Sequence, residues 1–96
     1  MLNVIIIAIK THHKLAFTYS GIPRIVEPHA VGSTRAGKDV LRCFQTHGSH
    51  VTPGHDWDLC EVSKISKLSD TGECFSNARP AYNKGDKCMF HIYAEL

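Results

Sequence analysis

The sequence lacks the patterns that mark most enzymes and membrane proteins. It contains no Gly-rich phosphate loop, no paired-carboxylate motif and no Ser-His-Asp pattern, so we expect no catalytic residues and no enzyme. Its apolar run from Val4 to Ile9 is far shorter than the ~20 residues that cross a bilayer. No basic residue stands ahead of that run and no small-residue cleavage site follows it, so we also expect no secretory leader.

The sequence also lacks a Cys-x-x-Cys pair, although it has four cysteines. Their wide spacing fits no tight metal or redox motif, and without a leader a disulfide framework is not expected. We therefore predict reduced thiols in a cytoplasmic protein. The four positions are Cys43, Cys60, Cys74 and Cys88.

A strong charge of either sign is missing as well. Eleven Lys and Arg against nine Asp and Glu leave a formal charge of +2, which permits an anionic partner without requiring one. A chain of 96 residues can bury one hydrophobic core, and no linker or repeat divides it. We predict a single domain over residues 1–96.

Residues 2–12 carry two conflicting signals. Leu2, Ile5, Ile6 and Ile9 fall at helical spacing and would form one apolar stripe. The β-branched run over residues 4–7 favours a strand instead. Periodicity alone leaves both readings open.

The rest of the chain reads as a succession of short strands. Alternation of apolar and polar residues is typical of half-buried strands, and the segment with Pro28 suits an edge or a bend. Turns every 8–12 residues favour a small barrel or sandwich. The expected strands are 15–19, 24–30, 39–46, 57–62, 65–68 and 88–96, with turns or loops at 20–21, 32–37, 47–56 and 69–72.

Read in order, these segments resemble the WYL domain family. The likeness is carried by AIK at 8–10, LAFTYSG at 15–21, RIVEPH at 24–29, GKDVLRCF at 37–44, WDLCEVSKI at 57–65, and Phe75 with RPAY at 79–82. The triplet that names the family is Asp39-Val40-Leu41 here and keeps only its leucine. The family's basic Arg-x-Asp-Arg pattern stands as EVSK at 61–64.

The resemblance implies a fold and a function. The fold is a mainly β, five-stranded antiparallel Sm- or SH3-like barrel with one N-terminal helix, which favours the helical reading of residues 2–12. WYL domains accompany helix-turn-helix regulators, helicases and CRISPR effectors, and several bind nucleotides or single-stranded nucleic acid. The implied function is a bacterial or phage module for ligand sensing in transcription regulation, without a helix-turn-helix of its own.

Basic and aromatic residues supply the candidate ligand site. Small barrels bind nucleic acid by combining a cationic groove with aromatic faces on which bases stack. Arg42 interrupts the apolar pattern of its strand, so it either borders a ligand site or pairs with an internal acid such as Glu27. Arg24 and Glu27 lie three apart on one strand and point to opposite faces, so each needs another partner. The predicted ligand-binding residues are Arg24, His29, Arg42, Lys64, Arg79 and Tyr82.

Seven histidines raise the question of a metal site. His47-x-x-His50 on a glycine-containing loop lacks the second pair of ligands that zinc sites usually show. We expect solvated loop histidines, no metal and no cofactor.

A different class of function stays open. Small barrels leave strand edges that pair readily with a neighbouring chain, so the domain could serve protein interaction or oligomerisation instead. The salt dependence of binding distinguishes these two functions, because phosphate contacts weaken steeply as salt increases and an apolar interface does not.

Overall fold

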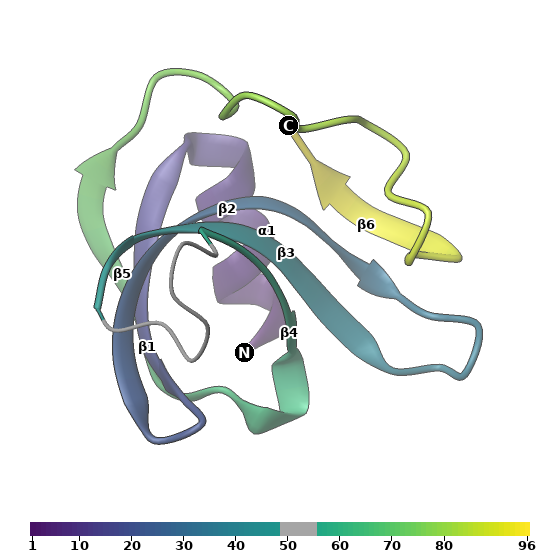
Figure 1. Ribbon diagram of the computed structural model, residues 1–96, viewed down its shortest axis with the longest axis horizontal. Coiled ribbons are helices and arrows are strands. Elements are labelled where there is room, and N and C mark those ends of the chain that lie inside the picture. The colour runs from purple at the N-terminus through teal and green to yellow at the C-terminus, as the bar shows by residue number, and fades with distance from the viewer. Residues whose placement is uncertain (49–55) are drawn as a thin grey trace.

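The computed structural model describes residues 1–48 and 56–96, which form one helix and a six-stranded antiparallel sheet (Figure 1). The mainly β architecture and the single N-terminal helix are confirmed, and the sheet has six strands, one more than the barrel that the resemblance implies. The elements are α1 (Leu2–Thr11), β1 (His13–Tyr19), β2 (Ile22–Ser33), β3 (Asp39–His47), β4 (Trp57–Glu61), the 3-10 turn η1 (Val62–Lys64), β5 (Ser66–Cys74) and β6 (His91–Glu95).

The strand order is β4-β3-β2-β1-β5, and β6 pairs with β2 beside this path. Two strands share one edge of β2 in succession: β1 pairs with the part before Pro28, and β6 pairs with Ala30 to Ser33. β4 and β5 stand at the two ends of the order and are not paired with each other among the described residues. The sheet is therefore curved but not closed.

The strand with Pro28 is central, which contradicts its predicted edge position. β2 pairs with three strands, and the prediction of a bend is the part that holds. The register of β2 against β3 shifts between Pro28 and Ala30. A proline has no N–H for the ladder, so it is tolerated inside a sheet at such a bulge. Because side chains alternate along a strand, Glu27 and His29 lie on the same face of β2.

The turn predicted at residues 69–72 is also wrong, because these residues belong to β5. Their turn-forming side chains bond to backbone groups within an irregular edge strand: Thr71 donates to Lys14 O at 2.9 Å, and Asp70 accepts from Gly72 N at 2.8 Å. The loop predicted at 47–56 falls mostly on residues 49–55, which lie outside the described part of the chain.

Helix α1 forms because its apolar stripe is buried against the sheet. Ile5 and Ala8 have no exposed surface, and Ile9 is 1% exposed. This burial outweighs the modest preference of β-branched residues for strands. The helix ends at His12, which adopts a left-handed conformation with φ of 57°.

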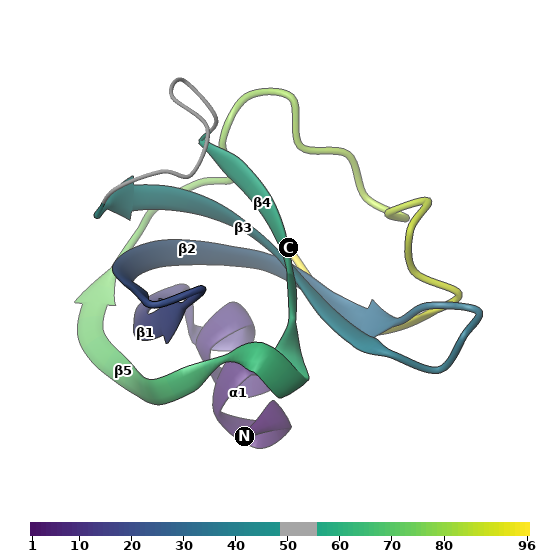
Figure 2. The same ribbon diagram turned by 60° about the horizontal axis from the view of Figure 1, so that its bottom comes forward.

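The sheet separates two apolar clusters. The larger lies between α1 and the sheet and includes Leu15, Val26, Leu41 and Cys43. The smaller contains Ala30, Val40 and Met89 on the opposite face, which we call the outer face. Residues 75–90, which we call the strap, connect β5 to β6 and cover this outer face; Figure 2 shows the strap and α1 on opposite sides of β2 and β3.

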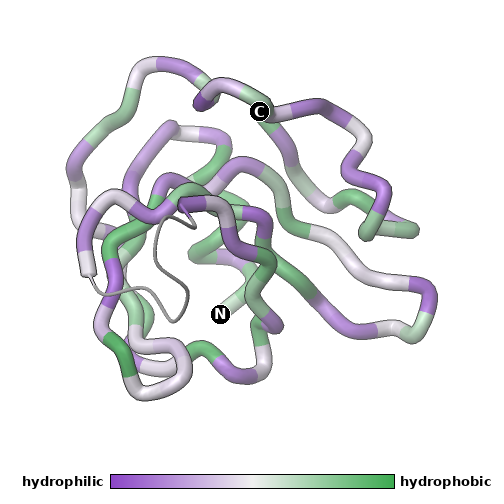
Figure 3. The backbone as a smooth tube through the Cα atoms, in the orientation of Figure 1, coloured by the Kyte–Doolittle hydropathy of each residue, from purple (hydrophilic) through white to green (hydrophobic). Residues whose placement is uncertain are grey.

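The strap is largely hydrophilic along its length, as the colouring of Figure 3 shows. It contacts the sheet through side chains such as Phe75, Arg79 and Tyr82. All four cysteines are free thiols, with Cys43 and Cys60 buried and Cys74 and Cys88 exposed. Within residues 1–48 and 56–96, no helix is long and apolar enough to cross a membrane.

Candidate functional site

A cluster of aromatic rings joins the strap to the outer face of the sheet. His29, which has no exposed surface, lies at its centre. The centroid of its imidazole is 4.7 Å from that of Trp57 on β4. Tyr82 and Phe75 of the strap follow at 5.0 and 5.9 Å. The bulge in β2 and the strap thus enclose the imidazole from both sides.

Hydrogen bonds fix the protonation of this histidine. Nδ1 of His29 lies 2.8 Å from the backbone oxygen of Glu27, and Nε2 lies 3.0 Å from the backbone N–H of Arg79. A carbonyl only accepts and an amide N–H only donates, so Nδ1 carries the proton and Nε2 offers its lone pair. Burial lowers the pKa of His29 below its ordinary value, which favours this neutral form.

Glu27 finds its partner in the strap. Nε of Arg79 donates to one carboxylate oxygen at 2.7 Å and Nη2 to the other at 3.0 Å, a two-bond fork. The Glu27 side chain is 4% exposed and that of Arg79 is 40% exposed. The Arg79 guanidinium also lies over the Phe44 ring, 4.5 Å from its centroid. Arg79 therefore anchors the strap to β2 and β3.

Arg42 pairs with Asp86 of the strap and not with Glu27. Its Nε donates to Asp86 at 2.7 Å, and the Asp86 side chain is 9% exposed. Burial raises the pKa of Asp86, but hydrogen bonds from Arg42 and from the backbone N–H of Cys88 outweigh it and leave the pKa below its ordinary value. The pair is ionised and closes one end of the outer face.

A cleft of about 600 Å³ opens beside this pair. One wall is aromatic: the rings of Trp57 and Tyr82 lie nearly parallel, 19° apart, with centroids separated by 6.2 Å. The other wall belongs to the strap. The lining residues are Arg42, Trp57, Ala81, Tyr82, Asn83, Lys84, Gly85, Asp86 and Lys87.

Two lysines in this cleft were not predicted. Lys84 and Lys87 are exposed, and neither forms an ion pair with another described residue. The pair Arg42–Asp86 neutralises itself, so these lysines make the cleft cationic. In the sequence, the two lysines flank Gly85-Asp86 in a turn-rich segment, and this pattern could have marked them as exposed cations. Only the fold brings that segment to the same cleft as Trp57.

The predicted ligand residues fall into two groups. His29, Arg42, Arg79 and Tyr82 share the outer face, although Arg79 lines a separate cavity of about 360 Å³ with Glu27 and Lys14. Lys64 lies in η1, where its Nζ is 3.6 Å from Glu61.

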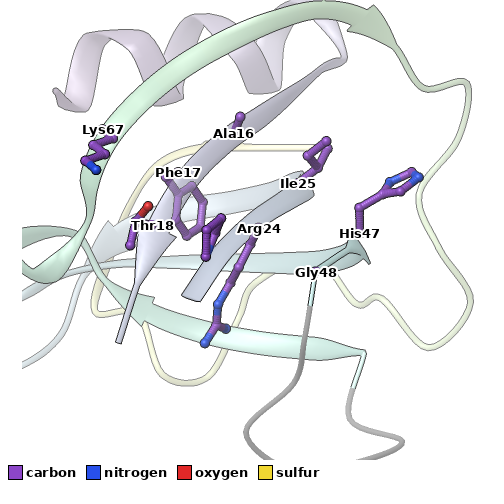
Figure 4. A pocket seen from close by; sticks show the side chains of 9 residues that line it. Ala16, Phe17, Thr18, Arg24, Ile25, His47, Gly48 and Lys67 are labelled. Carbon is purple, nitrogen blue, oxygen red and sulfur yellow. The ribbon is translucent and has the colours of Figure 1, made fainter. Parts of the chain in front are cut away.

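Arg24 is buried on the inner face, away from the cleft. Its Nη1 donates to Asp58 at 3.0 Å and its Nη2 to the Tyr19 carbonyl at 3.3 Å, while its Nε has no hydrogen-bond partner among the described residues. It also lines a cavity of about 350 Å³ at the β1–β2 hairpin (Figure 4), where its guanidinium and the amino group of Lys67 do not converge. The sheet separates Arg24 from the four predicted residues on the outer face.

Among the described residues, no group of three or more His, Cys, Asp or Glu side chains is placed to hold a metal ion. His50 of the His47-x-x-His50 pair lies outside the described residues. No protein-family model, curated protein or solved structure matches the chain.

Proposed function

We propose that the protein is a binding module for an anionic ligand that carries a base, either a nucleotide or single-stranded nucleic acid, and that the ligand occupies the cleft at Trp57 and Tyr82. The observation that carries the proposal is the juxtaposition of two parallel aromatic rings with two unpaired lysines. A base stacked on aromatic side chains gains ~1–3 kcal/mol. Lys84 and Lys87 then meet the phosphate, and a volume of about 600 Å³ admits a ligand of this size.

Arg42 has a positioning role in this proposal. Its guanidinium holds Asp86 at 2.7 Å, which keeps the turn with both lysines in place. The sequence left two roles open for Arg42, a place at the border of a ligand site or a pair with an acid. Arg42 has both, since it pairs with Asp86 and lines the cleft. The resemblance to WYL domains is a second, independent support for this function. On the same resemblance we propose that the curved sheet is a variant of the Sm- or SH3-like barrel and that the protein is cytoplasmic.

Trp57 provides the test, because it is the only tryptophan in the chain and it lines the cleft. Its fluorescence should be quenched when adenosine triphosphate or an eight-nucleotide oligothymidylate is titrated at 50 mM salt. Saturation by the triphosphate indicates a nucleotide site, and saturation by the oligonucleotide alone indicates a strand site.

Charge-matched variants complete the experiment. The double variant Lys84→Gln with Lys87→Gln should bind at least ~10-fold more weakly and with a smaller salt dependence, since each phosphate contact contributes to the slope. Lys10→Gln with Lys67→Gln removes the same charge from exposed positions outside the cleft and should bind like the parent. Equal loss in both double variants, or no quenching by either probe in the parent, would refute the proposal.

A second candidate function rests on exposed apolar side chains near β6. Phe90 is 60% exposed and Tyr93 is 42% exposed, and among the described residues β6 is paired on one edge only. A protein-interaction or oligomerisation domain would use this free edge. Sedimentation at increasing protein concentration tests it: a dimer whose stability does not fall with salt favours this function over the anion site.

A further inference from the structure

Besides the pair of Asp86 with Arg42 of β3, the strap is attached to β2 at the bulge around His29. Arg79 binds there twice, through its guanidinium to the Glu27 carboxylate and through its backbone N–H to His29 Nε2. The hydroxyl of Tyr82 donates to the His29 carbonyl at 3.3 Å. The strap also donates backbone hydrogen bonds near its two ends, from Phe90 N to the Ser33 carbonyl of β2 and from Phe75 N to the His12 carbonyl at the end of α1.

This attachment tolerates only the neutral form of His29. Both ring nitrogens are in use, and the backbone N–H of Arg79 needs the lone pair of Nε2. A second proton on the ring would place two donors face to face at a separation of 3.0 Å. It would also put a full charge on a side chain with no exposed surface, which is costly without a dedicated partner.

The groups around His29 do not supply such a partner. Glu27, on the same strand, attracts the charge, but its carboxylate is already forked by Arg79. Arg79 itself and His12, at the end of α1, repel a charged imidazole. Tyr82 of the strap offers a neutral phenol, whose pKa burial raises, and the described part of β3 and β4 presents the rings of Phe44 and Trp57 to this cluster. Burial is the main reason that the pKa of His29 is lowered.

The same segment carries most of the cleft. Seven of the nine lining residues are consecutive, from Ala81 to Lys87, and begin two positions after Arg79. Losing the bond at Arg79 and the ring contact of Tyr82 with His29 would therefore release this segment from β2 as far as Asp86, which Arg42 holds, and would separate Tyr82 from Trp57.

We propose that His29 is an acid-sensitive latch: when its imidazole takes up a proton, the part of the strap around Arg79 and Tyr82 leaves β2, and the aromatic wall of the anion-binding cleft comes apart. This regulation rests on the proposed function, but the latch itself can be observed without a ligand. A single proton drives the change, and Nε2 of His29 is its acceptor.

The first measurement follows the free protein from pH 7.5 to 4.5. Trp57 packs on both His29 and Tyr82, so its emission should shift to longer wavelength in one single-proton transition at a pH below the ordinary pKa of histidine, while far-UV circular dichroism keeps the sheet signal. His29→Gln, whose side chain does not titrate, should show no such transition. His91→Gln removes an exposed histidine of β6 and should behave like the parent.

Two results would overturn the latch. One is an unchanged Trp57 spectrum in the parent down to pH 4.5; the other is the same transition in His29→Gln. If His29→Gln does not fold, the ring protons of His29 are titrated by NMR in the parent, and a midpoint more than about one pH unit from that of Trp57 contradicts the proposal.

The second measurement concerns the ligand. Oligothymidylate is the probe, because neither thymine nor a phosphodiester titrates between pH 5 and 8. Binding to the parent should weaken at least ~10-fold from pH 7.5 to 5.0, and binding to His29→Gln should not. Equal affinity at both pH values alongside a Trp57 transition refutes the regulation. Absence of binding at every pH alongside that transition refutes the proposed function and leaves the latch standing.

Discussion

Removal of the Arg79 side chain should destabilise the fold far more than the loss of a surface charge. In Arg79→Ala, the Glu27 carboxylate stays on β2 with a side chain that is 4% exposed and loses charge-assisted bonds of 2.7 and 3.0 Å. Hydrogen bonds to a charged group contribute ~1.5–3 kcal/mol each, and breaking a fully buried pair costs ~3–5 kcal/mol.

The expected loss lies below that upper range. Arg79 is 40% exposed, so water screens the pair and can reach Glu27 once the guanidinium is gone. We expect Arg79→Ala to lower the free energy of unfolding by ~2–3 kcal/mol, which corresponds to a fall in Tm of roughly 10–20 °C for a domain of this size. Urea unfolding followed by Trp57 fluorescence measures the first quantity and calorimetry the second.

A matched control separates this effect from a general effect of charge. Arg35 is exposed, lies over the Phe90 ring at 5.0 Å and has no ion pair with another described residue, so Arg35→Ala should cost less than ~0.5 kcal/mol. The double variant with Glu27→Leu should recover part of the loss, because it removes the orphaned carboxylate. A cost below ~0.5 kcal/mol for Arg79→Ala, equal to the control, would show that the fork is an ordinary surface pair and refute the reasoning.

Two further outcomes are expected. Gly32→Ala should separate β6 from β2 and lower the free energy of unfolding by ~1–3 kcal/mol, because a Cβ at Gly32 would lie 2.1 Å from the backbone oxygen of His91. The control is Gly37→Ala, whose Cβ meets no neighbour within 4 Å and which tests only the positive φ at that position. Equal losses in urea unfolding would contradict the close approach of β6 to Gly32. In a thiol assay under native conditions, Cys74 and Cys88 should react at once and Cys43 and Cys60 only after denaturation, so four fast thiols would place the inner cluster in solvent.

Local patterns predicted most of the elements. Alternation located β1 and β3 within one or two residues, and the apolar stripe of residues 2–12 became α1 once burial decided between helix and strand. The two wrong predictions were those that relied on a residue's usual preference without its neighbours in the fold. Pro28 suggested an edge, but a bulge accommodates it in the central strand, and the turn formers of residues 69–72 are accommodated by bonds to the backbone in β5.

The structure brings together only some of the predicted site residues, for a related reason. Residue type identified His29, Arg42, Arg79 and Tyr82, which share the outer face, but it could not separate them from Arg24, which the alternation of β2 turns to the inner face with Asp58. Ion-pair partners such as Glu27 with Arg79 lie 52 positions apart, and no local pattern encodes such a distance.

By itself, the sequence determined the mainly β class, the helix-compatible stripe and the kinds of side chain available for an anionic ligand, because hydrophobic periodicity and residue chemistry are local properties. Only the tertiary structure decided that residues 75–90 cross the outer face, that Lys84 and Lys87 meet Trp57, and that His29 accepts its hydrogen bond from Arg79. These contacts depend on how the connection between β5 and β6 packs, and packing is a property of the whole chain.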